Sequence, residues 1–211
     1  MLVKILLDVL DNEDIVYEYT GSEMAHVYAV QMDGLYGYKE GVLYIRQTFP
    51  EPELPQNVCM ITGNDGLYNT IQDLLLSYSK KETALLRMHS MLSEGVSLTD
   101  EMAEAAKIME NPCILLREDK KVIAWGGLRE IEEFLWVTDI ELKKICAENG
   151  VVVCEDKSVQ QSYAYMAVAF VNSRGRKRYL VVIAQSNEFQ LVTDKIFLKN
   201  VCVFLEHGGS V

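Results

Sequence analysis

The sequence predicts an α+β protein: a small N-terminal α/β domain, a long linking helix, and a second domain with an antiparallel sheet flanked by helices. Two observations support this class. Short runs rich in Val, Ile and Tyr alternate with turn-forming residues, which is typical of strands. From Leu67 the apolar residues recur every three or four positions, as on a helix. We therefore expect domain boundaries at 1–66, 67–95 and 96–211.

The composition is that of a globular protein in a reducing compartment. Hydrophobic residues make up 49% of the 211 residues and charged residues 24%. The longest apolar stretch, 163–171, is shorter than the ~20 residues that cross a bilayer, and the N-terminus lacks the pattern of a signal peptide. The five cysteines have no CxxC spacing, which favours buried free thiols. We expect a cytoplasmic protein with no membrane contact.

The charge is acidic and unevenly distributed. The formal net charge is −11, and residues 1–66 hold eleven acidic residues against three basic ones. An acidic chain repels phosphate backbones, so we expect no direct nucleic-acid contact. The basic run SRGRKR at 173–178 is the exception. Its central Gly175 lies between two apolar runs, which favours a solvated hairpin turn.

The first domain is expected to contain one short helix and several strands. Residues 2–10 are apolar at most positions, which favours a helix, although a strand has the same composition. Runs rich in β-formers follow at 15–20, 25–31, 41–47 and 57–63.

The long helix is predicted over residues 66–94, with Gly95 as its C-cap. At 1.5 Å per residue it would be roughly 43 Å long, more than one small domain needs. Such a helix is either a dimer seam or a spine between domains. The polar stretch SYSKKET offers the alternative of a bend or a break near Ser79.

The second domain alternates helices with strands. A helix capped by Ser97 or Thr99 should end before Pro112, because proline cannot continue a helix. A hairpin, a mostly helical stretch over 129–150, and further strands should follow. The closing helix has Thr193 as its candidate N-cap.

This order of elements resembles a known family. The stretch from Leu85 to Trp125 is similar to the N-terminal sensory region of PucR/CdaR-type bacterial transcription regulators. The resemblance rests on a long helix ending in a glycine turn at Gly95, a short helix, Asn111–Pro112, an apolar strand and Asp119 in the following turn. The chain's last strand and helix are similar to those of a GAF-like domain.

The resemblance implies a ligand-sensing region that binds an unknown small-molecule effector and forms a homodimer through the 67–95 helix. These regulators continue into a helix-turn-helix, so the DNA-binding output is expected to lie beyond Val211. The aromatic and basic residues that could line a ligand cavity in such a domain are Trp125, Arg129, Trp136, Tyr163 and Tyr165. A tryptophan at a strand end is more often a core residue than part of a ligand wall, and either Tyr163 or Tyr165 could line the pocket.

Two alternatives remain open. The chain could be a dimerisation or scaffold module whose core is filled, or a cysteine-dependent enzyme on a GAF-like fold. Cys146 and Cys154 are the pair closest in sequence, yet both have a structural setting. No nucleotide-binding, serine-hydrolase or zinc-protease motif is present, and Gly126–Gly127 is a bare pair after a strand. We therefore expect no enzymatic activity, no cofactor and no metal site.

Overall fold

The computed structural model describes residues 1–32, 38–46, 58–63, 66–132, 134, 137, 151–154, 164–185 and 188–207. The chain divides into two compact units. The first comprises Met1–Lys80 with Leu191–Thr193, and the second comprises Lys81–Gln190 with Asp194–Val211.

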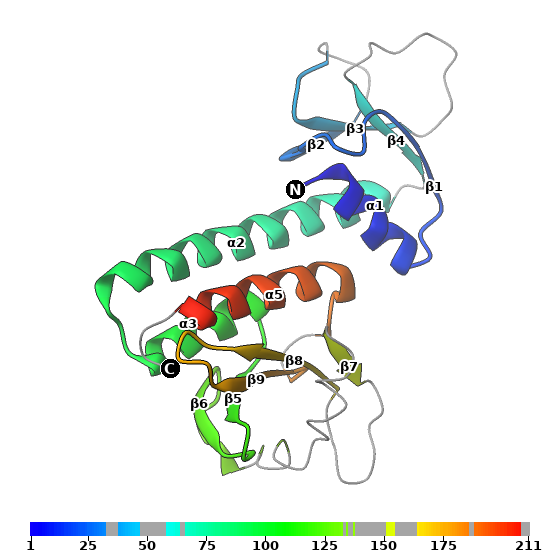
Figure 1. The fold of residues 1–211 in the computed structure, drawn as a ribbon. Helices are drawn as coiled ribbons and strands as arrows, with labels where there is room; N and C mark the ends of the chain where they lie inside the picture. The colour runs from blue at the N-terminus through cyan, green and yellow to red at the C-terminus, as the bar shows by residue number, and fades with distance from the viewer. Residues whose placement is uncertain are drawn as a thin grey trace. The chain divides into compact units, whose positions relative to one another are not determined.

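The first unit is a mixed four-stranded sheet with one helix of its own (Figure 1). Its strands lie in the order β1-β4-β3-β2; β3 pairs in parallel with β2 and with β4, whereas β1 pairs antiparallel to β4. The elements are α1 (Val3–Asn12), β1 (Tyr17–Thr20), β2 (Ala29–Met32), β3 (Val42–Arg46) and β4 (Cys59–Gly63). The predicted helix and four strands are confirmed.

The core of the first unit forms between α1, the sheet and the start of α2 (Leu67–Glu94). Leu6 and Leu10 of α1 are fully buried, as are Leu43 of β3 and Ile61 of β4. Ile71 of α2 belongs to the same cluster. The apolar spacing of α1 therefore reflects one buried helix face.

Helix α2 is continuous from Leu67 to Glu94, so the alternative of a break near Ser79 is wrong. It ends at Gly95, whose φ of +62° is the left-handed conformation that glycine adopts at low cost. The division between the two units falls within this helix, after Lys80.

The second unit has a five-stranded antiparallel sheet in the order β6-β5-β9-β8-β7. This architecture confirms the predicted α+β class. Ser97 caps the first helix, because its side chain accepts a hydrogen bond from the Asp100 amide. The elements are α3 (Leu98–Met109), β5 (Cys113–Arg117), β6 (Val122–Gly126), β7 (Val152–Cys154), β8 (Tyr165–Val171), β9 (Lys177–Ile183) and α5 (Leu191–His207).

Helices α3 and α5 cover one face of this sheet (Figure 1). Alternate residues of each strand point to that face, among them Cys113 of β5 and Leu180 of β9, which are both fully buried. Met102 and Ala105 of α3 are also fully buried. We call this side the helix face, and the opposite side the outer face.

The predicted N-cap of the closing helix is wrong. The helix begins at Leu191, so Thr193 lies inside its first turn. The Gln190 amide donates to Asp194 Oδ2 at 2.8 Å, and the Asp194 amide donates to the Gln190 carbonyl at 2.9 Å. The Asp194 carboxylate, in the first turn, thus accepts a hydrogen bond from the amide of Gln190, the residue just before the helix. Among the described helices, none combines the length and apolar character that crossing a bilayer requires.

Candidate functional site

The outer face of the five-stranded sheet carries two of the sequence-predicted residues that the structure describes, Trp125 and Tyr165. Partners in register share a face, so one row can be followed across the whole sheet. That row consists of Trp125, Ile114, Val181, Ala167 and Val152. Trp125 therefore stands on the outer face, at the edge formed by β6.

Tyr165 lies on the same face, because it pairs with Ile183 of β9, which is in phase with Val181. Two strands separate it from Trp125 and it lies two residues further along the strand, which places the two residues roughly 16 Å apart at the usual strand geometry. Trp125 is 37% exposed and Tyr165 is 9% exposed. The structure brings them onto one surface but not into contact range of a common small group.

Small side chains occupy the outer face of β8. Ala167 and Ala169 alternate outward after Tyr165, and Tyr179 stands opposite Ala169 on β9. Phe134, in the segment after β6, is buried in the same apolar cluster. The outer face is therefore a packed apolar layer of aromatic and short side chains, with Trp125 exposed at its edge.

The other predicted residues are placed as follows. Arg129 is exposed, three residues beyond the end of β6. Trp136 and Tyr163 lie outside the described residues, as does Cys146. Tyr165 is placed on the outer face. A ligand role for Tyr163 stays a prediction.

The glycine pair after Trp125 has a packing role. A Cβ on Gly126 would lie 1.9 Å from the Met102 carbonyl oxygen, so helix α3 approaches the strand where only glycine fits. Gly127 has a φ of +78°, which turns the chain away from the sheet. These contacts explain the pair without a bound phosphate.

Two of the four described cysteines, Cys113 and Cys202, lie in settings that disfavour nucleophilic chemistry. Burial raises the pKa of the Cys113 thiol and that of Cys202 well above the ordinary range. Cys154 is half-buried, at the end of β7. Within the described ranges, no three His, Cys, Asp or Glu side chains gather in a way that could hold a metal ion.

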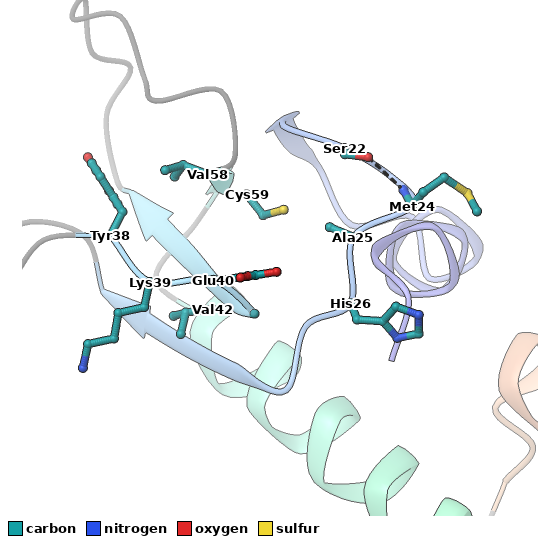
Figure 2. Close-up of a pocket in the computed structure, with 11 residues that line it drawn as sticks. Ser22, Met24, Ala25, His26, Tyr38, Lys39, Glu40, Val42, Val58 and Cys59 are labelled. Atoms are coloured by element: carbon teal, nitrogen blue, oxygen red, sulfur yellow. Dashed lines mark hydrogen bonds between the residues drawn. The ribbon is translucent and has the colours of Figure 1, made fainter.

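A second candidate lies in the first unit. A hollow of about 760 Å³ opens beside the sheet (Figure 2). Figure 2 shows the side chains of Cys59, Glu40 and His26 around it. The lining residues are Ser22, Met24, Ala25, His26, Tyr38, Lys39, Glu40, Gly41, Val42, Val58 and Cys59. They come from three separate segments, so no local spacing in the sequence could have indicated this hollow.

The wall of the hollow is held by tyrosine hydrogen bonds. The Tyr19 hydroxyl donates to the Ser22 carbonyl at 3.0 Å, and the Tyr28 hydroxyl donates to the Glu40 carbonyl at 2.9 Å. Burial, and then a hydrogen bond with the Cys59 thiol, raises the pKa of Tyr19. Tyr19 thus stays protonated at neutral pH, and its role is to fix the loop that carries Ser22.

Comparison with solved structures finds similar folds at low sequence identity. An N-acylhomoserine-lactone-dependent LuxR-family transcription factor from Burkholderia cenocepacia covers 62% of this chain and 96% of its own, with 11% identity and a TM-score of 0.47. The GAF domain of a phosphoenolpyruvate-protein phosphotransferase from Coxiella burnetii covers 62% and 93%, with 11% identity and a TM-score of 0.46. The corresponding Acinetobacter GAF domain covers 59% and 89%, with 20% identity and a TM-score of 0.44. No protein-family model and no curated protein matches the sequence.

Proposed function

We propose that the chain is the sensory region of a cytoplasmic bacterial transcription regulator of the PucR/CdaR type. Its second unit binds a small-molecule effector on the outer face of the sheet. The observation that carries this proposal is Trp125, which is 37% exposed at the edge of a sheet face whose other side chains are packed with Phe134 and Val137.

The chemistry of that face supports a small, partly apolar ligand. Trp125 offers a broad, partly exposed apolar wall at one edge of the sheet, beside the buried cluster that contains Ala167. Arg129, exposed beyond β6, supplies a positive charge that could pair with an anionic group of the effector. The proposed role is ligand binding alone, without chemical conversion of the ligand.

Helix α2 is the proposed route of the signal. It is continuous across the division between the two units, and Leu76 and Leu86 on it are 54% and 71% exposed. Exposed leucines on a long helix favour a second copy of the chain as partner. An effector that binds one state of the dimer more tightly shifts the population toward that state.

Effector binding can be tested by thermal-shift screening of the purified chain against purines, amino acids, organic acids and nucleotides. A ligand that binds the folded state raises the melting temperature by mass action. We expect at least one class to do so, and Trp125→Ala to abolish the shift. Val203→Ala removes a similarly exposed apolar side chain from α5 and should leave it intact.

A filled scaffold would give another pattern. No compound class would shift the melting temperature, and Trp125→Ala would unfold the unliganded chain. That result would refute the sensory role and leave the dimerisation module as the function.

The dimer is tested separately by light scattering on a sizing column. Leu86→Glu introduces a charge on the exposed side of α2 and should convert a dimer into a monomer. Val203→Glu, which makes the same change on α5, should not. A wild-type chain that is monomeric over the micromolar range would remove the proposed seam.

A further inference from the structure

A buried arginine lies at one end of the five-stranded sheet. Arg178 is the second residue of β9, and only 6% of its surface is exposed. The register pairs it with Phe170 on β8, and it is in phase with Leu180, so it lies on the helix face. This is the face opposite to Trp125.

The polar atoms of Arg178 are poorly satisfied. Its Nη1 donates to the Lys177 carbonyl at 3.0 Å, while its Nε is buried without a hydrogen-bond partner. Over the described residues, no carboxylate lies within ion-pair distance of it. A buried charge left unpaired costs folding free energy, so such a group needs a reason.

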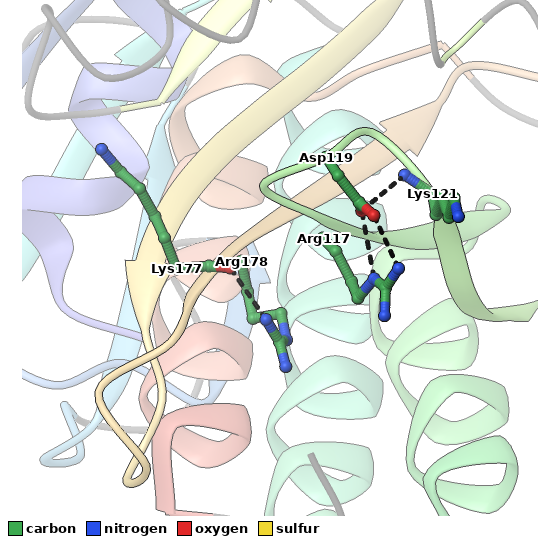
Figure 3. Close-up of polar contacts among 5 residues, drawn as sticks. All are labelled: Arg117, Asp119, Lys121, Lys177 and Arg178. Atoms are coloured by element: carbon green, nitrogen blue, oxygen red, sulfur yellow. Dashed lines mark hydrogen bonds and ion pairs between the residues drawn. The ribbon is translucent and has the colours of Figure 1, made fainter.

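The residue opposite Arg178 on the neighbouring strand β5 is also positively charged. Arg117 of β5 stands directly opposite Arg178, and like charges in register destabilise a sheet. Asp119 satisfies Arg117 instead: its two oxygens accept from Arg117 Nε at 3.1 Å and Nη2 at 2.6 Å (Figure 3). Asp119 also accepts from the Lys121 amide at 3.3 Å. The Asp119 carboxylate is therefore committed to Arg117 and its turn.

The surroundings of Arg178 are strongly basic in an acidic chain. Two turns meet at this end of the sheet, at 117–121 and 174–178, and together they hold seven basic residues and two acidic ones. Burial, followed by the charges of Arg176, Arg117 and Arg174, lowers the pKa of Arg178. The local field thus favours an added negative charge.

We propose that Arg178 and the two basic turns form an anion site that takes a phosphate group, either free or carried by a phosphorylated small molecule. The flat guanidinium matches phosphate in two-point contacts, which a lysine ammonium cannot do. A dianion offsets both Arg178 and its Arg176 neighbour, whereas a single carboxylate offsets one charge. The site lies on the opposite face from the effector surface and is independent of it.

The test is a titration of the ¹⁵N-arginine-labelled full chain with inorganic phosphate, followed by the Nε–Hε signals. Chloride and acetate at matched ionic strength are the comparisons. Arg178→Lys assigns the Arg178 signal by its loss. We expect that signal to move saturably with phosphate and to move little with the two monoanions.

Affinity for phosphate is then compared among variants by calorimetry. Arg178→Gln should weaken binding by about tenfold or more, which corresponds to one lost charge-assisted contact. Arg178→Lys should weaken it less, since the charge remains. Lys199→Gln removes one exposed charge from α5 and should change the affinity by less than about twofold.

Three results would overturn the proposal. The first is an Arg178 signal that responds equally to all three anions, which is screening by salt. The second is equal weakening by Arg178→Gln and Lys199→Gln. The third is tight binding of an oligonucleotide that phosphate does not displace, which would assign the basic turns to a nucleic-acid backbone. Should Arg178→Gln fail to fold, the wild-type titration and Arg178→Lys still decide the matter.

Discussion

Replacing Gly126 with alanine is expected to destabilise the second unit by about 3 kcal/mol, the upper end of the usual cost of overpacking. The added Cβ would lie 1.9 Å from the Met102 carbonyl oxygen and 2.4 Å from the Met102 carbonyl carbon. Both are backbone atoms of α3, so no side chain can rotate to make room. To restore ordinary contact the helix would have to retreat by about 1.5 Å.

Gly175→Ala is the matched control for this change. Gly175 has a φ of +70° and nothing within 4 Å of the added Cβ, so its cost is only that of a left-handed backbone, about 1–2 kcal/mol. Urea unfolding of both variants, monitored by circular dichroism, gives the two free energies. If Gly126→Ala costs no more than Gly175→Ala, the close approach of α3 to β6 is wrong.

Three further outcomes follow from buried groups. Burial raises the pKa of Glu101, so the folded chain binds a proton more tightly than the unfolded one, and stability falls as pH rises through the raised pKa. Glu101→Gln should remove that fall in melting temperatures measured between about pH 4 and pH 7. Lys81→Met leaves the Asp194 carboxylate buried without its cation and should cost about 3–5 kcal/mol in chemical unfolding, part of which Lys81→Met/Asp194→Asn recovers. In the native chain, Cys154 should react with a thiol reagent well before Cys113, because Cys113 is fully buried and its pKa is raised. Peptide mass spectrometry measures the two reaction rates. Equal rates would reopen the cysteine-enzyme alternative.

Elements with local boundary signals could be predicted from the sequence. The helix Leu98–Met109 is an example, because Ser97 satisfies its first amides and Pro112 prevents its continuation. The hairpin that follows has apolar runs on both sides of a polar turn, and it forms as expected. In each case the information lies within a few residues of the boundary.

Features set by contacts distant in sequence could not be predicted. Thr193 has the right chemistry for an N-cap, but Asp194 also pairs with Lys81, 113 residues away, and caps the Gln190 amide. The hollow in the first unit is likewise assembled from separate segments. A local pattern carries no information about such partners.

The basic run at 173–178 lies between these extremes. The sequence predicts a solvated turn, and Gly175 does sit in a turn with a positive φ. Arg178 differs, because the strand already begins at Lys177 and its alternation places Arg178 on the side that the helices cover. Its parity with Leu180 and Val182 is a signal that could have identified the buried charge.

The central claim is that a small molecule binds on the outer face, against Trp125. The most direct test is a fluorescence titration of Trp136→Phe, in which Trp125 is the one remaining tryptophan, with each compound that raises the melting temperature. We predict a saturable change in Trp125 emission whose midpoint agrees with the thermal shift. A compound that stabilises the chain and leaves Trp125 emission unchanged would contradict the claim and place the ligand elsewhere.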